Sequence, residues 1–164
     1  MALTQLNNQS LTNVSALPAG VGGKVLQVVQ AVSSTSTDTT SSSYQDVAGL
    51  SLQITPSSTS SKILVLCDLR IRAQSSDNIN AGLQIVRDTT SIYEDAQFFN
   101  IGVNANVGVA THSAFSYLDS PSTTSATTYK LQLKRTNVSG TGYGVSINLS
   151  SGNKSTITLM EIAG

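Results

Sequence analysis

The stretch Gly23–Val65, GKVLQVVQAVSSTSTDTTSSSYQDVAGLSLQITPSSTSSKILV, decides the fold. Three apolar runs with the alternation typical of β-strands are separated in it by loops made almost entirely of Ser and Thr. The runs supply strands and the loops supply polar turns. The stretch holds almost none of the nucleophiles, bases or metal ligands that chemistry needs, so it predicts architecture rather than a catalytic site.

The same pattern continues through the rest of the chain. Apolar alternation is clear in Leu50–Ile54, Ile63–Ile71, Ala81–Ile85 and Leu131–Leu133. Further strands are expected at Lys24–Val32, Ile92–Phe99, Val107–Asp119, Val145–Leu149 and Thr156–Ile162. About nine strands with short polar connections, and no convincing amphipathic helix, predict an all-β protein with an antiparallel β-sandwich. At this chain length we expect the sandwich to be jelly-roll-like.

Composition sets the character of the surface. The 164 residues are the size of one domain, and Ser and Thr together make up roughly a quarter of them. Charged residues are only 11% of the chain, and nine basic side chains balance nine acidic ones. The surface is therefore expected to be neutral and rich in hydroxyl groups. It lacks the long-range field of a protein that binds nucleic acid or an anionic membrane, so we expect neither partner.

Residues 1–22 differ in character from the predicted sandwich domain, 23–164. Their apolar side chains are spaced irregularly among Asn, Gln, Ser and Thr, and LPAGVGG ends the segment with turn-forming residues. We interpret 1–22 as an extended N-terminal arm that docks on the domain itself or on a neighbouring subunit, against the alternative of a terminus without a role. Its expected anchors are Leu3, Leu6, Leu11, Val14 and Leu17. The segment has neither the basic start nor the apolar core of a signal peptide, so export by that route is not expected.

Two single-copy residues limit the possible chemistry. Cys67 is the only cysteine, and it is in phase with the apolar residues of Ile63–Ile71, so we expect a buried small hydrophobe rather than a reactive thiol. His112 is the only histidine, which excludes a zinc site built from several histidines. It alternates out of phase with Phe115 and Tyr117, so it is expected to face solvent or an interface rather than act as a base.

The acidic residues do not form a catalytic pair. Glu94 and Asp95 are adjacent, so on a strand their side chains point to opposite faces and cannot converge. Asp88 in RDTTS and Asp119 in LDSPS are expected to open turns. No P-loop, dinucleotide-binding glycine pattern, EF-hand or G-x-S-x-G motif is present. We therefore expect no enzyme activity, no cofactor, no metal and no catalytic residue.

An ordered series of phrases resembles a known family. GKVLQVVQA, SYQDVAGLSLQITPSSTSSKILVL, GLQIVRDTTSIYE and STITLMEI resemble a domain of tailed-bacteriophage virion proteins, especially in phages of aquatic bacteria and cyanobacteria. In many of these relatives the domain is the C-terminal part of a longer tail fibre. The resemblance covers Lys24–Ile162 and carries no functional residue to transfer. It implies a β-sandwich that works as a homotrimer on the outer surface of a virion, after synthesis in the host cytoplasm.

Two functions fit that resemblance. This chain lacks the long shaft and large N-terminal domain of the fibres, which favours a capsid decoration or cement protein attached by its arm to the major capsid protein or other virion proteins. The alternative is a tail-fibre or spike tip, an adhesin that contacts a glycan or protein on the host surface. A third possibility, a small hydrolase or lectin on a jelly roll, is disfavoured by the scarcity of catalytic side chains and of exposed aromatic residues.

Overall fold

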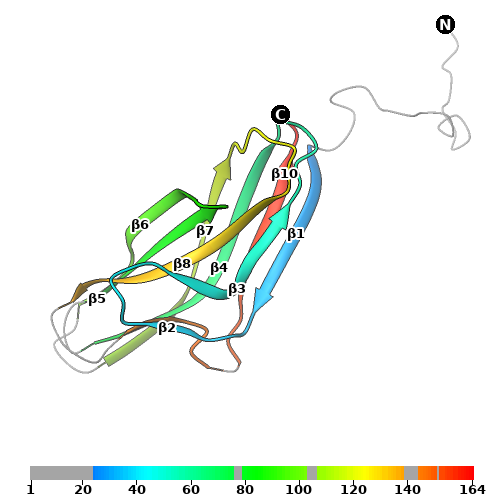
Figure 1. Ribbon diagram of the computed structural model, residues 1–164. Helices are drawn as coiled ribbons and strands as arrows, with labels where there is room; N and C mark the ends of the chain where they lie inside the picture. Colours follow the sequence, from blue (N-terminus) through cyan, green and yellow to red (C-terminus); the bar gives the residue numbers. More distant parts are fainter. Residues whose placement is uncertain (1–23, 76–78, 103–106, 139–143, 151) are drawn as a thin grey trace, which may run out of the picture.

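The structure is a computed structural model, and it describes residues 24–75, 79–102, 107–138, 144–150 and 152–164. Within these ranges the chain forms ten β-strands and no helix (Figure 1). The strands are β1 (Val25–Ser33), β2 (Thr37–Thr39), β3 (Gln45–Ile54), β4 (Lys62–Ser75), β5 (Ile79–Arg87), β6 (Thr90–Ile101), β7 (Val107–Asp119), β8 (Thr127–Val138), β9 (Val145–Ile147) and β10 (Ser155–Ile162). The predicted arm, 1–22, lies outside the described residues.

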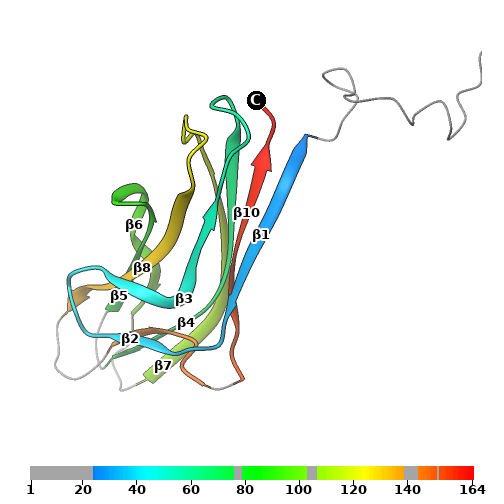
Figure 2. The ribbon, with the colours of Figure 1, turned by 45° about the vertical axis from the view of Figure 1, so that its right-hand side comes forward.

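The strands form two sheets that pack as two layers (Figure 2). Sheet A has six strands in the order β1-β10-β4-β9-β2, with β7 paired along β4 as well. Sheet B has four strands in the order β3-β8-β5-β6. Every pairing within the described residues is antiparallel. The prediction of an all-β, jelly-roll-like sandwich is confirmed.

Strand β4 shows why this sequence builds a sandwich. Its alternate residues from Ile63 to Ala73 are buried, so they form the inner face of sheet A. Across the interior they meet the buried side chains of sheet B, including Tyr129, Leu131 and Leu133 on β8. Cys67 lies among them with 3% of its surface exposed, as its phase predicted. The core therefore follows from the period of two in the apolar pattern.

Strand β1 brings the two ends of the described chain side by side. It pairs with β10 from Val25–Ile162 to Ser33–Ser155, and the backbone amide of Ala163 donates a hydrogen bond to the carbonyl of Lys24 at 2.7 Å. Strand β10 in turn pairs with β4. The start of β1 therefore lies beside the C-terminus, at the same end of the sandwich as the loop between β3 and β4 (Figure 1). Whatever precedes Lys24 enters the domain at this end.

Candidate interaction surface

Side chains capable of catalysis or metal binding do not cluster in the part of the chain that the structure describes. No group of three or more His, Cys, Asp or Glu side chains there is arranged to hold a metal ion. A helix with the length and apolar character needed to span a membrane is not found among the described residues. The side chain of His112 is 61% exposed, and its Nδ1 lies 3.4 Å from Asp68 Oδ1. The prediction that His112 points out of the domain is confirmed.

The other residues singled out in the sequence are also separated. Burial raises the pKa of the Cys67 thiol to about 12, which keeps it protonated. Glu94 accepts hydrogen bonds from Tyr44 and Lys134, whereas Asp95 accepts one from the backbone amide of Gln97. The two acids therefore have different partners, as expected for adjacent residues of a strand. The predicted anchors of the arm lie outside the described residues: Leu3, Leu6, Leu11, Val14 and Leu17.

The prediction that Asp119 simply opens a turn is wrong, because its side chain links the two sheets. It ends β7 with 5% of its surface exposed. The Tyr129 hydroxyl donates to its Oδ2 at 2.6 Å, and Arg87 Nη1 donates to both carboxylate oxygens at 2.8 Å. Burial raises the pKa of Tyr129, and its hydrogen bond to Asp119 adds to that. Asp119 thus fixes the end of sheet A to two strands of sheet B.

Asp88 does lie in a turn, as predicted. It follows β5 in the tight β5–β6 connection and has a φ of 52°, a conformation that Asp tolerates better than most residues. Its backbone amide donates to the Thr128 carbonyl at 2.8 Å, and its Oδ1 accepts from the Thr128 amide at 2.9 Å. The turn is therefore tied to β8.

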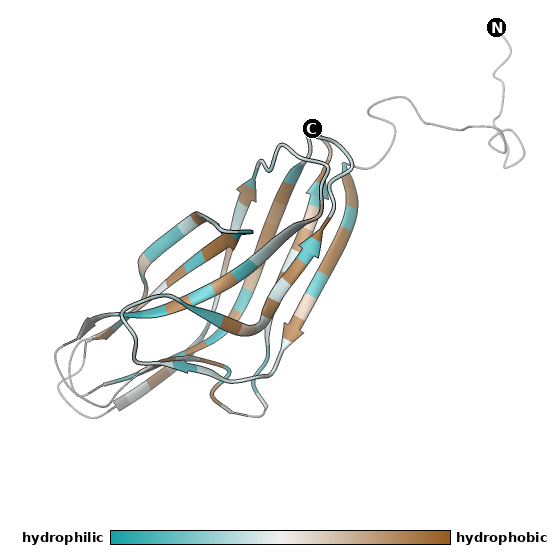
Figure 3. Cartoon of the chain, viewed as in Figure 1, coloured by the Kyte–Doolittle hydropathy of each residue, from teal (hydrophilic) through white to brown (hydrophobic). Residues whose placement is uncertain are grey.

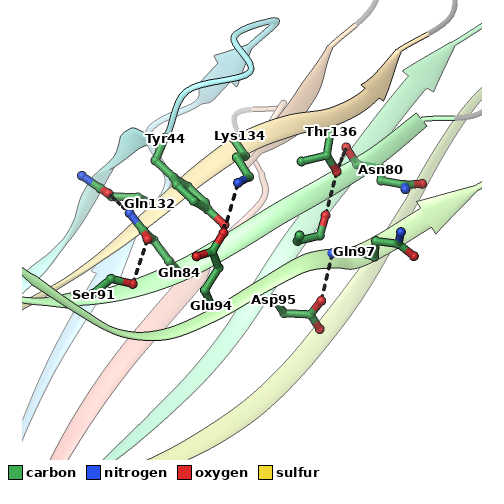
Figure 4. Close-up of polar contacts among 11 residues, drawn as sticks. Tyr44, Asn80, Gln84, Ser91, Glu94, Asp95, Gln97, Gln132, Lys134 and Thr136 are labelled. Atoms are coloured by element: carbon green, nitrogen blue, oxygen red, sulfur yellow. Dashed lines mark hydrogen bonds and ion pairs between the residues drawn. The ribbon is translucent and has the colours of Figure 1, made fainter.

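The outer face of sheet B is polar and bonded to itself (Figure 4). Lys134 Nζ lies 3.1 Å from Glu94 Oε1 and 4.2 Å from the centre of the Tyr44 ring. Farther along the same face, Gln84 and Gln132 are hydrogen-bonded, and Gln132 also donates to Asp46. Many polar side chains of this face thus bond to one another, and the face presents a hydrophilic surface.

The outer face of sheet A is different, because an apolar row crosses it. Val28 on β1 is paired with Met160 on β10, Met160 with Leu64 on β4, and Leu64 with Leu118 on β7. Val28 and Leu118, at the two ends of the row, are 53% and 55% exposed. We call these four residues the apolar row. Figure 3 shows hydrophobic residues recurring along β1 at its edge of the sheet.

The apolar row belongs to a larger apolar surface. Seven large hydrophobic residues are exposed within the described residues, and six of them lie on sheet A: Val25, Leu26, Val28, Val32, Leu66 and Leu118. Together they expose on the order of 500 Å², distributed over β1, β4 and β7. Exposed apolar surface of this extent often marks a site of contact with another molecule.

A shallow hollow of about 420 Å³ lies beside the apolar row. Its walls come from β4, β7 and β10, with Leu66 and Asp68 facing the small side chains of Ala114 and Ser116. Because small residues lie next to larger ones on the same face, the surface here is indented rather than flat. The titratable groups among the residues that line the hollow are Asp68 and the Cys67 thiol, and His112 lies near Asp68.

The sequence contained part of the signal for this surface. The run Ile63–Leu66 is apolar at every position, so a strand through it has hydrophobic residues on both faces. Leu118 has the same phase as His112 and therefore also points outward. The alignment of Leu64 with Val28 could not be seen, because it depends on the order in which distant strands pair.

Comparisons with known proteins do not assign this chain to a family. No protein-family model matches it, and no curated protein matches it. Among solved structures, one similar chain is from infectious bursal disease virus, Gt strain, with 13% identity and a TM-score of 0.44 over 84% of this chain. Another is from the T13 particle of the same virus, with 15% identity and a TM-score of 0.47 over 87% of this chain.

A third similar structure is Eiger TNF from S. frugiperda, with 10% identity and a TM-score of 0.35 over 83% of this chain and 93% of its own. This chain spans only 38% and 36% of the two viral chains. Viral particle proteins are thus among the structures that this chain resembles. Likeness at this level does not transfer a function, which has to be argued from the surfaces themselves.

Proposed function

We propose that the protein is a non-catalytic structural protein of a bacteriophage virion, a trimeric capsid decoration or cement protein on the outer surface of the particle. It is made in the host cytoplasm, and its partners are other copies of itself and the major capsid protein or other virion proteins. The resemblance of four phrases in the sequence to tailed-phage virion proteins motivates the proposal. It requires no cofactor, metal or nucleic acid.

The observation that carries the proposal is the contrast between the two outer faces of the sandwich. Sheet B presents polar side chains that bond to one another, such as Lys134 with Glu94. Sheet A presents the apolar row, whose ends are more than half exposed. Exposed apolar area is costly in water, at roughly 25 cal/mol per Å². A subunit that buries one face in an assembly and shows the other to solvent needs this division.

The arm completes the proposed attachment. Segment 1–22 contains no charged side chain, and it joins the described chain at the start of β1, where Val25 and Leu26 are exposed. An extended chain gains backbone hydrogen bonds along its whole length and places its apolar side chains in pockets of the partner. Repeated over a symmetric shell, many weak attachments of this kind add up to firm binding. We propose this role for Leu3, Leu6, Leu11, Val14 and Leu17.

A second candidate is a tail-fibre or spike tip that contacts a glycan or protein of the host surface. It is favoured by the fact that the sequence phrases resemble domains of tail fibres. In that case the polar face of sheet B and the Ser/Thr loops would meet the host, and the arm would join the tail. The two candidates place the protein on different parts of the virion.

Its location on the virion separates the candidates. Antibodies raised against this chain, visualised by electron microscopy on intact virions, should label the whole shell of the capsid if the protein decorates it. Label confined to the tail would support the fibre tip and contradict decoration. Label on neither part would contradict both. In parallel, a chain lacking residues 1–20 should fold and keep its oligomeric state but fail to enter virions, and its normal incorporation would contradict the role of the arm.

A further inference from the structure

We infer that the outer face of sheet A is the surface through which copies of this chain associate, with the Val28 end of the apolar row in one copy packed against the Leu118 end in the next. This inference rests on the proposed trimer and deepens it by naming its contact. It does not depend on where the trimer sits on a virion. The occupant of the apolar face is therefore a second copy of the same chain.

The pairing register gives the geometry. Because Val28, Met160, Leu64 and Leu118 are successive pairing partners across four strands, they lie at one level along the strand direction. Rotation about an axis parallel to the strands keeps every side chain at its level. The β1 end of the row in one copy then meets the β7 end in the next copy, and a ring of three such contacts closes.

Exposure along the apolar row fits contact at its ends. Val28 and Leu118 are 53% and 55% exposed, whereas Leu64 and Met160 between them are only partly exposed. The two ends also lie on the outermost strands of this part of sheet A, since within the described residues β1 pairs only with β10 and β7 only with β4. The largest uncovered apolar surfaces are thus placed where a neighbouring copy would arrive from either side.

The charges on this face permit contact between the two ends of the apolar row. Like charges that face each other across the contact would repel, so the residues around the row need to be neutral or of opposite charge. The level next to the apolar row is uncharged and consists of Gln30, Thr158, Leu66 and Ser116. On the other side Lys62 is the nearest charge, and its Nζ donates to Ser120 at 2.7 Å. Each copy makes two contacts in the ring, so its exposed apolar area of on the order of 500 Å² is divided between them, and polar neighbours would have to supply the rest of the roughly 800 Å² per partner of a standard stable interface.

The full-length protein can be tested in solution by sedimentation equilibrium or by light scattering coupled to gel filtration. The wild type should have a mass of about 51 kDa, three times the 17.1 kDa of one chain. V28K and L118E should each fall to the monomer mass at concentrations at which the wild type is a trimer, with at least a tenfold weaker association. L149D is the matched control, because Leu149 is the one exposed large hydrophobic among the described residues that lies off sheet A. It should keep the trimer.

A charge-pair variant tests the arrangement itself. In V28K/L118E each contact in the ring brings one Lys against one Glu, so the trimer mass should return. The two positions are three strand spacings apart, about 14 Å, too far to pair within one chain. Far-UV circular dichroism checks that every variant is folded. A wild-type monomer, single variants that stay trimeric, or a double variant that stays monomeric would each overturn the inference. A wild-type monomer that still decorates virions would overturn this inference and the proposed trimer, and would leave the decoration role and the attachment by the arm standing.

Discussion

Glu161 accepts two hydrogen bonds from a single residue, Ser57: one from its backbone amide at 2.7 Å and one from its hydroxyl at 2.6 Å. Ser61 and the side-chain amide of Gln27 donate two more, at 2.7 and 2.6 Å. The carboxylate is only 1% exposed, and all four donors are neutral groups. It thus ties the Ser/Thr-rich loop after β3 to β10 and β1.

The stability of the domain should depend on the charge of Glu161 in acid. Burial would raise the pKa of Glu161, but the hydrogen bonds from Ser57, Ser61 and Gln27 outweigh it and hold that pKa at about 2, against 4.5 in the unfolded chain. A lowered pKa stabilises the folded state above pH 4.5, and this stabilisation is lost as the pH falls toward 2. It amounts to about 3 kcal/mol.

E161Q is the reference that isolates this effect, because it keeps the size of the side chain but cannot ionise. Urea unfolding of the wild type and E161Q should be compared at pH 6 and pH 2.5. Between these two pH values the wild type should lose more unfolding free energy than E161Q, so the difference between the two proteins should shrink in acid. Parallel losses in the two proteins would show that Glu161 is not the group responsible.

Removing Asp119 should destabilise the domain more than removing the hydroxyl that it binds. D119A leaves the buried Tyr129 hydroxyl without its acceptor and Arg87 without its carboxylate, at a cost of about 2–4 kcal/mol. Y129F removes one hydrogen bond and leaves the Arg87 pair in place, at a cost of about 1 kcal/mol. Chemical denaturation of both variants at neutral pH measures the difference. Equal costs would mean that the Arg87 pair contributes nothing.

The Cys67 thiol should be unreactive in the folded protein. It is buried in the core, and its raised pKa leaves little thiolate at neutral pH. Labelling with a thiol reagent such as DTNB at pH 8 should be at least about 100-fold slower than for the same protein in denaturant. Fast labelling under native conditions would show that β4 opens readily or that the thiol is accessible.

Gly49 should not tolerate a side chain. It has a φ of 73°, and a Cβ added to it would lie 2.7 Å from Ser33 Oγ, which already donates to the Ala48 carbonyl. G49A should therefore cost about 2 kcal/mol from backbone strain and steric conflict. G152A is the matched control, because a Cβ there meets no atom within 4 Å. Thermal unfolding of both variants should show a loss for G49A alone.

The local alternation of apolar and polar residues was enough to predict most of the strands. Alternation placed Val107–Asp119 with the bounds that the structure gives to β7, and it predicted the inward phase of Cys67. Strand β2, Thr37–Thr39, was missed because it consists of Thr and Asp within a Ser/Thr loop. Its strand conformation comes from pairing with β9, more than 100 residues later. A polar three-residue strand has no periodicity from which it could be predicted.

The candidate surface depended on the pairing order more than on composition. The sequence shows that Leu64 and Leu118 point outward, but only the order β1-β10-β4-β7 aligns them with Val28 and Met160. Asp119 was predicted to open a turn because LDSPS has turn composition, whereas burial and the partners Arg87 and Tyr129 come from strands of the other sheet. Both features arise from contacts distant in sequence, which no short window contains.

The copy number of this chain in purified virions tests the central proposal most directly. Quantitative mass spectrometry can give its ratio to the major capsid protein, whose number is fixed by the symmetry of the shell. A decoration protein repeated over the capsid should be present in on the order of hundreds of copies per particle, as attachment by many weak contacts requires. A count of a few tens or fewer would contradict decoration and place the protein in a tail structure instead.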